Sequence, residues 1–586
     1  MTTFGNVVVF ACIISASVSA DSAISLCGTV KDGDDKPIAG AAVSLVSDSS
    51  LLDTTDADGG FSISKNSAAA NSSPLHIPVR SISDIRIHGN TLTFITVLPA
   101  ATVFFRIYSA NGRRTAAQTL EKTVRGTCKF TLPDLVSGIY IVQISLGRSA
   151  HSFKLVSNDG TLSYGGIQQK ETNGKPVLYG AAVTVDTLFI EKTGFKPLGE
   201  TITSYMQTGM EIIMDRTKSP SITVSSMPQI KEMPDPLTMK NGDTVTTPEQ
   251  WRLRRREMIR ILEDYEYGHM PPPPGNVKAT VATALTRVTA GGKQADYRMM
   301  HLTFGPGEKC GFDLGLFTPV TPPDSNGHPV LIYLGYANPT KSSLGDASVA
   351  LGRGYAVAII NYTQLGADNT SWKSSAFFPS YPDYDWRDFS AWAWGLSRAV
   401  DYLVTDTVID KGKIMVTGVS RCGQPVLLAG AFDERIALSA PVAGGMALRF
   451  SGKEMGGGLG QGITEVVDQG TYWFGPLFEK FRNQTPRLPC DQHWLPALTA
   501  PRLFIMCNSF ADQYGRAYAA VQTYLGAKPV YEFLDADDNL GMNFREGTHG
   551  MTSADWSALL DFADQKLLKK EGTRKFDVIP PADKLP

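Results

Sequence analysis

The fold is decided by the stretch KIMVTGVSRCGQPVLLAGAF, residues 413–432, in which a strand-like apolar run passes through a short turn into a helix-like apolar run. Ser420 lies in that turn, two residues after Gly418, in the arrangement of a nucleophile elbow. The usual elbow has its second glycine two residues after the serine, where this sequence has Cys422, and Gly423 follows one residue later. These residues alone do not distinguish a nucleophilic serine from an ordinary turn serine.

The region around this turn alternates short apolar strands with helical segments. Runs such as HPVLIYLGY and YAVAIINY are typical of strands, DFSAWAWGLSRAVDYLVTD is typical of a helix, and PVYEFLDA is the last predicted strand. Residues 246–268 have the pattern of an amphipathic helix that Thr247 can cap. This alternation predicts an α/β fold around a mostly parallel sheet. Together with the elbow it indicates an α/β-hydrolase domain, a three-layer sandwich, over 230–577, followed by a tail of residues 578–586.

The sequence before residue 217 has the alternating apolar and polar residues of β-sandwiches, with Gly, Asp and Pro at the turns. PIAGAAVSL and TDADGGFSI resemble the carboxypeptidase-regulatory-like domain, and we predict that residues 21–66 and about 160–216 form one such sandwich. Residues 80–156 resemble secretion or attachment modules of bacterial polysaccharide degraders and are predicted to be inserted into it. Residues 217–229 are a linker. We expect these small all-β modules to act as spacers or in adhesion.

The first 20 residues, MTTFGNVVVFACIISASVSA, have the short apolar core and small final residues of a secretory signal peptide. They contain no Lys or Arg, so a buried first strand is the alternative. The stretch is too short to span a bilayer comfortably. We therefore expect a bacterial protein that is secreted, periplasmic or held at the cell surface, without a membrane span.

Composition excludes several kinds of partner. The chain of 586 residues is too long for one core and has the 42% apolar and 19% charged residues of a soluble globular protein. A formal net charge of −2 provides no field to attract nucleic acid. Seven cysteines are present, of which Cys12 would leave with the signal peptide, and none forms a C-x-x-C or zinc-like cluster. We expect no metal and no cofactor.

A serine nucleophile needs an acid and a base, which follow it in that order along α/β-hydrolase chains. Of the eight histidines, His493 and His549 follow Ser420. His549 lies in the Gly-flanked loop REGTHGMT before the last predicted helix, where a base must be placed to reach the serine, whereas His493 opens an apolar helical run and is interpreted as structural. Asp512, after the predicted strand PRLFIMCN, is the expected acid, and a surface-loop role is its alternative.

Further motifs resemble the glucuronoyl esterases of carbohydrate esterase family 15, especially the bacterial branch. The likeness covers about 230–577 and depends on YDWRDFSAWAWGLSRAVDYL, TGVSRCGQ, GTYWFGPLFEKF, LPCDQHWLPALTAPR and REGTHGMT in one order. The family's elbow is G-x-S-R-x-G, so its second glycine falls on Gly423. The resemblance implies that Ser420 is the nucleophile, His549 is the base, and the guanidinium of Arg421 stabilises the oxyanion together with its own backbone N–H.

Two positions depart from the family pattern. Many members carry a glutamate acid where this chain has Ala443, which cannot orient a histidine, so the acid must come from elsewhere and Asp512 is favoured. Asn508 falls on a place where some bacterial members carry aspartate. Gln424 stands where the family usually has a lysine that contacts the glucuronate hydroxyls; its amide can donate and accept hydrogen bonds but carries no charge.

The resemblance also implies substrate contacts. Gln461 and Gln469 roughly match sugar-contacting polar positions, and Phe510 or Trp473 is a candidate aromatic wall for a pyranose ring. Together these features imply a monomeric, secreted serine carboxylesterase that cleaves 4-O-methyl-glucuronoyl esters between plant cell-wall glucuronoxylan and lignin alcohols. An acetylxylan or other carbohydrate esterase, and a catalytically impaired carbohydrate-binding relative, remain as alternatives.

Overall fold

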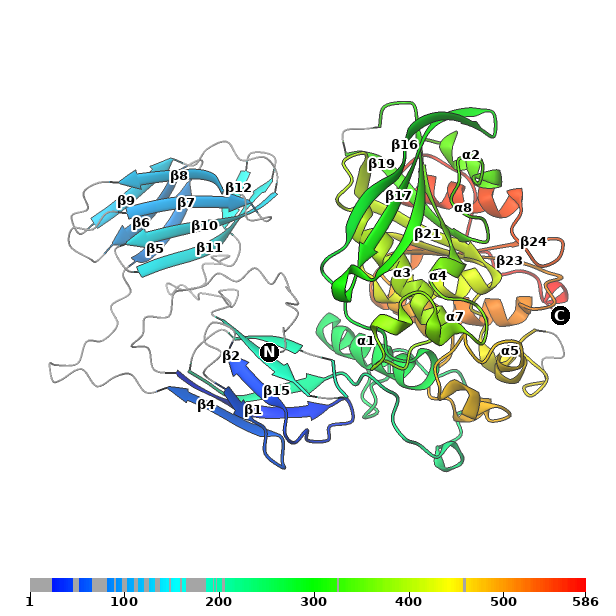
Figure 1. Cartoon of the computed structure of the whole chain (residues 1–586), viewed down its shortest axis with the longest axis horizontal. Helices are drawn as coiled ribbons and strands as arrows, with labels where there is room; N and C mark the ends of the chain where they lie inside the picture. Colours follow the sequence, from blue (N-terminus) through cyan, green and yellow to red (C-terminus); the bar gives the residue numbers. More distant parts are fainter. Residues whose placement is uncertain are drawn as a thin grey trace. The chain divides into compact units, whose positions relative to one another are not determined.

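The computed structural model describes residues 24–45, 52–65, 186–192, 194–196, 198–202, 206–323, 326–456 and 460–585, and the backbone of the strands between 82 and 164. The predicted signal peptide lies outside the described residues. The chain folds as two compact units (Figure 1). One contains residues 194–196 and 215–585, and the other contains the strands before residue 215.

The smaller unit is built of short strands. These are β1 (Ile24–Asp32), β2 (Ala42–Leu45), β3 (Leu52–Thr54), β4 (Gly60–Lys65), β5 (Ile82–His88), β6 (Thr91–Thr96), β7 (Val103–Ser109), β8 (Arg114–Leu120), β9 (Gly126–Thr131), β10 (Gly138–Leu146), β11 (Ser149–Asn158), β12 (Thr161–Tyr164), β13 (Asp186–Glu191), β14 (Leu198–Ile202) and β15 (Met206–Met214). Their sheets have the orders β15-β1-β4, β14-β13-β2-β3, β12-β11-β10-β7-β8 and β5-β6-β9. The first two sheets join strands from both sides of residues 82–164, and β1 pairs in parallel with β15.

A nine-stranded mixed sheet forms the centre of the larger unit (Figure 1). Its strands are β16 (Lys278–Ala290), β17 (Lys293–Phe304), β18 (Cys310–Pro319), β19 (His328–Gly335), β20 (Ala356–Asn361), β21 (Ile409–Val419), β22 (Leu438–Val442), β23 (Leu503–Ser509) and β24 (Leu540–Arg545). The order is β16-β17-β18-β20-β19-β21-β22-β23-β24. The strands from β19 to β24 are parallel, while β16 to β18 are antiparallel. The predicted α/β fold with a mostly parallel sheet is confirmed.

Helices cover both faces of this sheet. They are α1 (Pro248–Leu262), α2 (Ser348–Leu351), α3 (Asp388–Leu403), α4 (Gly423–Phe432), α5 (Ile463–Gln469), α6 (Trp494–Thr499), α7 (Ala517–Phe533) and α8 (Ser553–Lys566). The predicted cap of the first helix is confirmed: the Thr247 hydroxyl accepts the N–H of Gln250, whose side chain accepts the N–H of Thr247. After Leu262 the chain continues as a short π-helical turn over Glu263–Tyr267.

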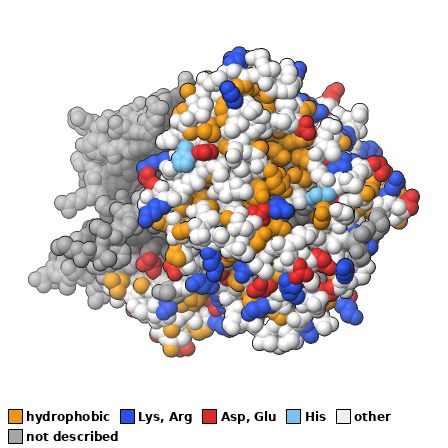
Figure 2. Space-filling view, turned by 45° about the vertical axis from the view of Figure 1, so that its right-hand side comes forward, with side chains coloured by type: hydrophobic (Ala, Val, Ile, Leu, Met, Phe, Trp, Pro, Cys, Tyr) orange, Lys and Arg blue, Asp and Glu red, His pale blue; other side chains and the backbone are white. Residues whose placement is uncertain are grey.

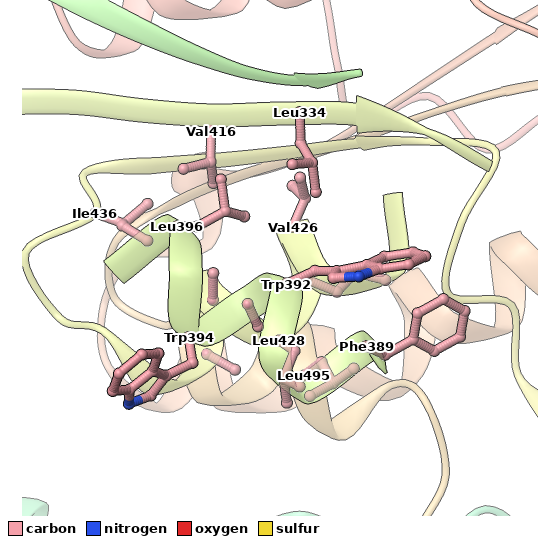
Figure 3. Close-up of a cluster of buried hydrophobic side chains, with 14 of the residues drawn as sticks. Leu334, Phe389, Trp392, Trp394, Leu396, Val416, Val426, Leu428, Ile436 and Leu495 are labelled. Carbon is pink, nitrogen blue, oxygen red and sulfur yellow. The ribbon is translucent and has the colours of Figure 1, made fainter. Parts of the chain in front are cut away.

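The main core lies between the sheet and helices α3 and α4. Figure 3 shows Leu334 of β19 and Val416 of β21 pointing from the sheet toward these helices, where Trp392 and Val426 are also buried. Fourteen of the 16 residues of α3 are buried, so this helix is enclosed on nearly every side. The core therefore holds α4, and the turn that precedes it, in a fixed position.

The predicted strand PVYEFLDA is wrong, because most of that run is the end of α7 and the last strand is β24 instead. Tyr524, Ala527 and Tyr531 of α7 are buried with helical spacing, and α7 packs on β23 and β24. Pro529 inside the helix removes one backbone hydrogen bond. Burial of Tyr531, whose hydroxyl donates to the carbonyl of Arg502, outweighs that loss.

The surface has no dominant charge on the face shown in Figure 2, where acidic and basic side chains lie interspersed around apolar ones. The five cysteines whose side chains the structure describes are free thiols. In the same part of the chain, no helix has the length and apolar character that crossing a membrane requires.

Candidate active site

Ser420 stands on a sharp turn between β21 and α4. The strand ends at Val419, a 3-10 turn covers Ser420–Cys422, and α4 begins at Gly423. Ser420 has a φ of +60°, a left-handed conformation that residues other than glycine rarely adopt. Such strain is typical of a nucleophile elbow, where it exposes the serine hydroxyl at the end of the strand.

Two glycines allow the strand, turn and helix to approach one another. A Cβ atom at Gly418 would lie 2.7 Å from the carbonyl oxygen of Cys422, and one at Gly423 would lie 3.0 Å from that of Val442. Gly423 therefore supplies the close strand–helix contact that the second elbow glycine usually supplies. Cys422 is fully buried, and burial raises the pKa of its thiol, so it packs as a core residue.

The carboxyl ends of four neighbouring parallel strands meet at one edge of the sheet. Ser420 follows β21, Ala443 follows β22, Asp512 follows β23 and His549 follows β24. A cavity of about 540 Å³ opens at this edge, and Ser420, Ala443 and His549 line it. Ligands bind at this end of the strands in sheets of this kind.

His549 and Asp512 are hydrogen-bonded to each other. The Nδ1 atom of His549 lies 2.8 Å from Oδ2 and 3.0 Å from Oδ1 of Asp512. Oδ1 of Asp512 also accepts the backbone N–H groups of Tyr514 and Gly515, both at 2.9 Å, which fix the buried carboxylate. With Nδ1 engaged by the carboxylate, Nε2 is the imidazole nitrogen that remains for chemistry in the cavity.

Arg421 lines the same cavity and is held by Asp368, a residue that sequence reasoning missed. Nη1 of Arg421 donates to Oδ2 of Asp368 at 2.6 Å, and its guanidinium lies 5.2 Å from the ring centroid of Trp473. Oδ1 of Asp368 accepts the indole N–H of Trp473, also at 2.6 Å. Burial opposes the charge of Arg421, but the hydrogen bond and charge of Asp368 raise its pKa. The result is a fixed cation beside Ser420.

Comparisons with known proteins agree on one family. Residues 307–535 match the family model described as glucuronyl esterase, fungi. Carbohydrate esterase MZ0003, from an unknown prokaryotic organism, is 29% identical over 403 residues, which cover 57% of this chain and 89% of that protein. The 4-O-methyl-glucuronoyl methylesterase of Podospora anserina is 31% identical over 365 residues, which cover 59% of this chain and 70% of that protein.

A solved structure, the carbohydrate esterase family 15 glucuronoyl esterase from Caldicellulosiruptor kristjansonii, aligns with a TM-score of 0.52 and 30% identity over 62% of this chain and 97% of that one. The chain belongs to the glucuronoyl esterase family. This membership confirms the predicted family, the enzyme class of carboxylic ester hydrolases and the α/β-hydrolase fold.

Other polar residues considered for the esterase site lie in structural positions. The Nε2 atom of His493 donates to the carbonyl of Pro234 at 2.8 Å. Burial lowers the pKa of His493 to about 4, so it is neutral at neutral pH and enclosed in protein. The side-chain amide of Asn508 donates to the carbonyl of Gly515 at 3.1 Å and supports the loop that carries Asp512.

The predicted substrate contacts of the esterase divide into two groups. Gln461, Gln469 and Trp473 line the cavity with Ser420. Phe510 lies outside it, because its ring stacks on Phe544 with centroids 5.5 Å apart. The cavity's aromatic wall therefore includes Trp473, and Phe510 packs behind the loop of the acid.

Gln424 reaches the cavity wall and belongs to a buried polar network that the sequence did not reveal. Its side-chain N–H₂ donates to the Tyr267 hydroxyl and to Oε1 of Gln492, both at 2.6 Å. The amide nitrogen of Gln492 donates in turn to Glu266. Because the nitrogen of Gln424 is committed to the protein, its Oε1 is the atom available to the cavity, and this atom accepts hydrogen bonds.

Glu266 is the carboxyl group of this network. It is fully buried, and burial, helped by the charge of Asp491, raises its pKa to about 8. The folded esterase therefore holds a proton on Glu266 between about pH 4.5 and 8 that the unfolded chain has released. Because the folded state binds this extra proton, Glu266 contributes to the free energy of unfolding at low pH. That contribution is lost as the pH rises from about 4.5 to 8.

Replacing Glu266 by glutamine should therefore stabilise the esterase at pH 8 and change little at pH 5. Glutamine keeps the shape of the protonated acid but never ionises. We expect the melting temperature of the variant to exceed that of the wild type by at least about 3 °C at pH 8. Thermal unfolding at pH 5, 6.5 and 8 measures this difference. Glu571→Gln, at an exposed position, is the control, and a Glu266→Gln difference that stays constant with pH contradicts the prediction.

Proposed function

We propose that this chain is a secreted serine esterase that hydrolyses glucuronate or 4-O-methyl-glucuronate esters on xylan and releases a lignin-type alcohol. Membership of the glucuronoyl esterase family supports the substrate class. The observation that carries the proposal is the hydrogen-bonded pair of His549 and Asp512, whose imidazole lines the same cavity as the strained Ser420.

In the first half-reaction, Ser420 is the nucleophile. Nε2 of His549 takes the hydroxyl proton while the oxygen attacks the ester carbonyl, and Asp512 stabilises the imidazolium through Nδ1. The tetrahedral oxyanion is stabilised by the guanidinium and backbone N–H of Arg421, beside the helix N-terminus of α4. His549 then gives its proton to the departing alcohol, which leaves an acyl-enzyme.

In the second half-reaction, water replaces the alcohol. His549 takes a proton from the water as it attacks the acyl carbonyl, and the same groups hold the second oxyanion. The proton returns to the oxygen of Ser420 when the acid leaves. No step needs a redox partner, because one ester bond is broken and one water molecule is consumed.

The sugar ring would rest against Trp473, with Gln461, Gln469 and Gln424 as polar contacts. The free Oε1 of Gln424 suits a hydroxyl donor of the ring rather than its carboxyl group. Arg421 is the one lysine or arginine among the described residues that line the cavity. A smaller acyl group, as in acetylated xylan, is the second candidate, because Gln424 brings no charge to select an acidic sugar.

A panel of esters tests the substrate class. We expect kcat/KM for methyl and benzyl glucuronate to exceed that for acetylated xylan by at least about tenfold, which corresponds to one additional hydrogen bond in the transition state. A preference for acetyl esters would contradict the proposal. A serine-directed phosphonate should label the wild type and leave Ser420→Ala unlabelled; no label on either protein would indicate a carbohydrate-binding relative.

We also propose how the rest of the chain serves this enzyme. The strands of residues 24–65 and 186–214 would form the carboxypeptidase-regulatory-like sandwich, with 82–164 as an insertion, and the pairing of β1 with β15 supports this arrangement. These modules would hold a monomeric enzyme near the bacterial cell surface or near plant cell-wall polymer. Export would depend on the predicted signal peptide.

A further inference from the structure

We propose that a second cavity of the catalytic unit binds a uronate residue of the polysaccharide, close to the ester that the active site cleaves; this inference rests on the proposed function. The cavity has a volume of about 400 Å³, within the usual range of about 300–1,000 Å³ for ligand sites. Four aromatic side chains, three prolines, three cations and one carboxylate line it. Trp372, Lys218, Lys373 and Arg387 carry the argument.

The cations of this cavity are available to an anion. Among the ion pairs formed by the described residues, none joins Lys218, Lys373 or Arg387 to a carboxylate. The one lining carboxylate, Asp385, binds the backbone N–H and Nδ1 of His269 at 2.8 and 3.0 Å. Although burial opposes its protonation, Asp264 and Asp385 raise the pKa of His269 to about 9, so the one positive charge of His269 offsets one of these two carboxylates. Three cations and a single carboxylate line the cavity itself. The cavity is therefore net basic.

Arg387 is a partly desolvated cation. Its Nη1 donates to the carbonyl of Thr471, and its guanidinium lies 5.7 Å from the ring centroid of Trp372. Burial lowers the pKa of Arg387, while the charges of Glu479 and Asp385 oppose that effect only from a distance. An anionic ligand would offset the cost of keeping this guanidinium charged away from water.

Trp372 supplies an aromatic surface between the cations. Its ring packs edge-on against Phe378 with centroids 4.8 Å apart, and Nζ of Lys373 lies 5.4 Å from its centroid. An indole face suits the apolar face of a sugar ring. An uncharged lignin ring would also suit the aromatic walls, but it would leave three cations without a partner. The combination therefore favours a sugar that bears a carboxylate.

The two cavities share a wall. Arg387 lines the second cavity, and Phe389, two residues later, lines the active-site cavity. Likewise Trp473 lines the active-site cavity and Pro476 the second one. The backbone N–H of Phe389 donates to the carbonyl of Trp473, so these two segments are bonded together. A xylan chain with one uronate ester at Ser420 can therefore present a second uronate on the other side of this wall.

The test compares two ester substrates in the full-length enzyme. One is a xylo-oligosaccharide with one esterified and one free uronate, and the other is benzyl glucuronate. We expect Lys373→Gln and Lys218→Gln each to lower kcat/KM about 3- to 10-fold for the oligosaccharide and to leave the small ester within about twofold, as loss of a charge-assisted contact predicts. Lys411→Gln, at the other end of β21 from Ser420, is the matched control.

Several outcomes would overturn the inference. Equal losses of kcat/KM on both esters, or no loss on either, would contradict it. The same loss on an oligosaccharide without the free uronate would also contradict it, because that result would indicate a neutral sugar or an aromatic ligand. Trp372→Ala removes the aromatic surface on which the sugar ring would stack, and it should lower kcat/KM for the oligosaccharide in the same selective way. If the wild type cleaves no glucuronate ester, the proposed function fails separately. The cavity is then tested by titrating the ester-free, uronate-bearing oligosaccharide, whose binding must weaken in Lys373→Gln and persist in Lys411→Gln.

Discussion

Replacement of Asp512 by asparagine is expected to lower kcat about 10³- to 10⁴-fold and to leave KM within a few-fold. The carboxylate accepts two backbone N–H groups and faces Nδ1 of His549 at 2.8 Å. If the asparagine oxygen keeps the backbone contacts, its N–H₂ group faces His549. The imidazole then holds its proton on Nε2, where it cannot accept the proton of Ser420.

Steady-state kinetics on benzyl glucuronate measures this loss. Asp537→Asn, in an exposed position after α7, is the matched control and should retain wild-type kcat. Because asparagine has the shape of aspartate, the melting temperature of Asp512→Asn should stay close to that of the wild type. If the variant kept more than about a tenth of the activity, another residue would have to orient His549.

Replacement of Arg421 by glutamine is expected to lower kcat about 10²- to 10³-fold, the usual cost of removing one oxyanion donor. The guanidinium is fixed between Asp368 and the ring of Trp473, so it needs no rearrangement when the oxyanion forms. Since a guanidinium stays ionised, the loss should be the same from pH 6 to 9. Arg421→Lys should recover only part of it, because an ammonium cannot match the planar, stacked contact.

Comparing the change in kcat with the change in KM shows whether Arg421 stabilises the transition state or only binds the substrate. A loss in kcat with little change in KM indicates stabilisation of the transition state, whereas a raised KM with unchanged kcat would mean that Arg421 only binds the ground state, contrary to the prediction. Arg252→Gln, on the exposed side of α1, is the control for loss of a surface arginine and should behave like the wild type.

The sequence predicted those parts of the fold that local pattern determines. The elbow is contiguous from Gly418 to Gly423, and the cap at Thr247 depends on a residue three positions away, so neither needs knowledge of distant contacts. The segment from Pro529 was misassigned because a short apolar run has no period that separates a strand from the end of a buried helix. Only packing against β23 and β24 decides that it is helical.

The candidate site was predictable where chain order limits the choices. Asp512 and His549 each follow a strand that comes after Ser420, as the order of α/β-hydrolase chains requires. Asp368 and Glu266 were missed because their contacts are distant in sequence: Asp368 lies 53 residues from Arg421, and Glu266 lies 226 residues from Gln492. No periodicity or motif links such pairs.

The ends of β22 and β23 lie side by side at the edge of the sheet that carries the candidate site. Ala443 and Asp512 follow adjacent strands, and the backbone N–H of Ala443 donates to the carbonyl of Cys507, which binds the two ends together. If Asp512 orients His549, as proposed, we expect a carboxylate at position 443 to reach the same edge of the sheet from the next strand, while Ser420 and His549 keep their places. Two neighbouring strand ends would then be alternative origins for the acid.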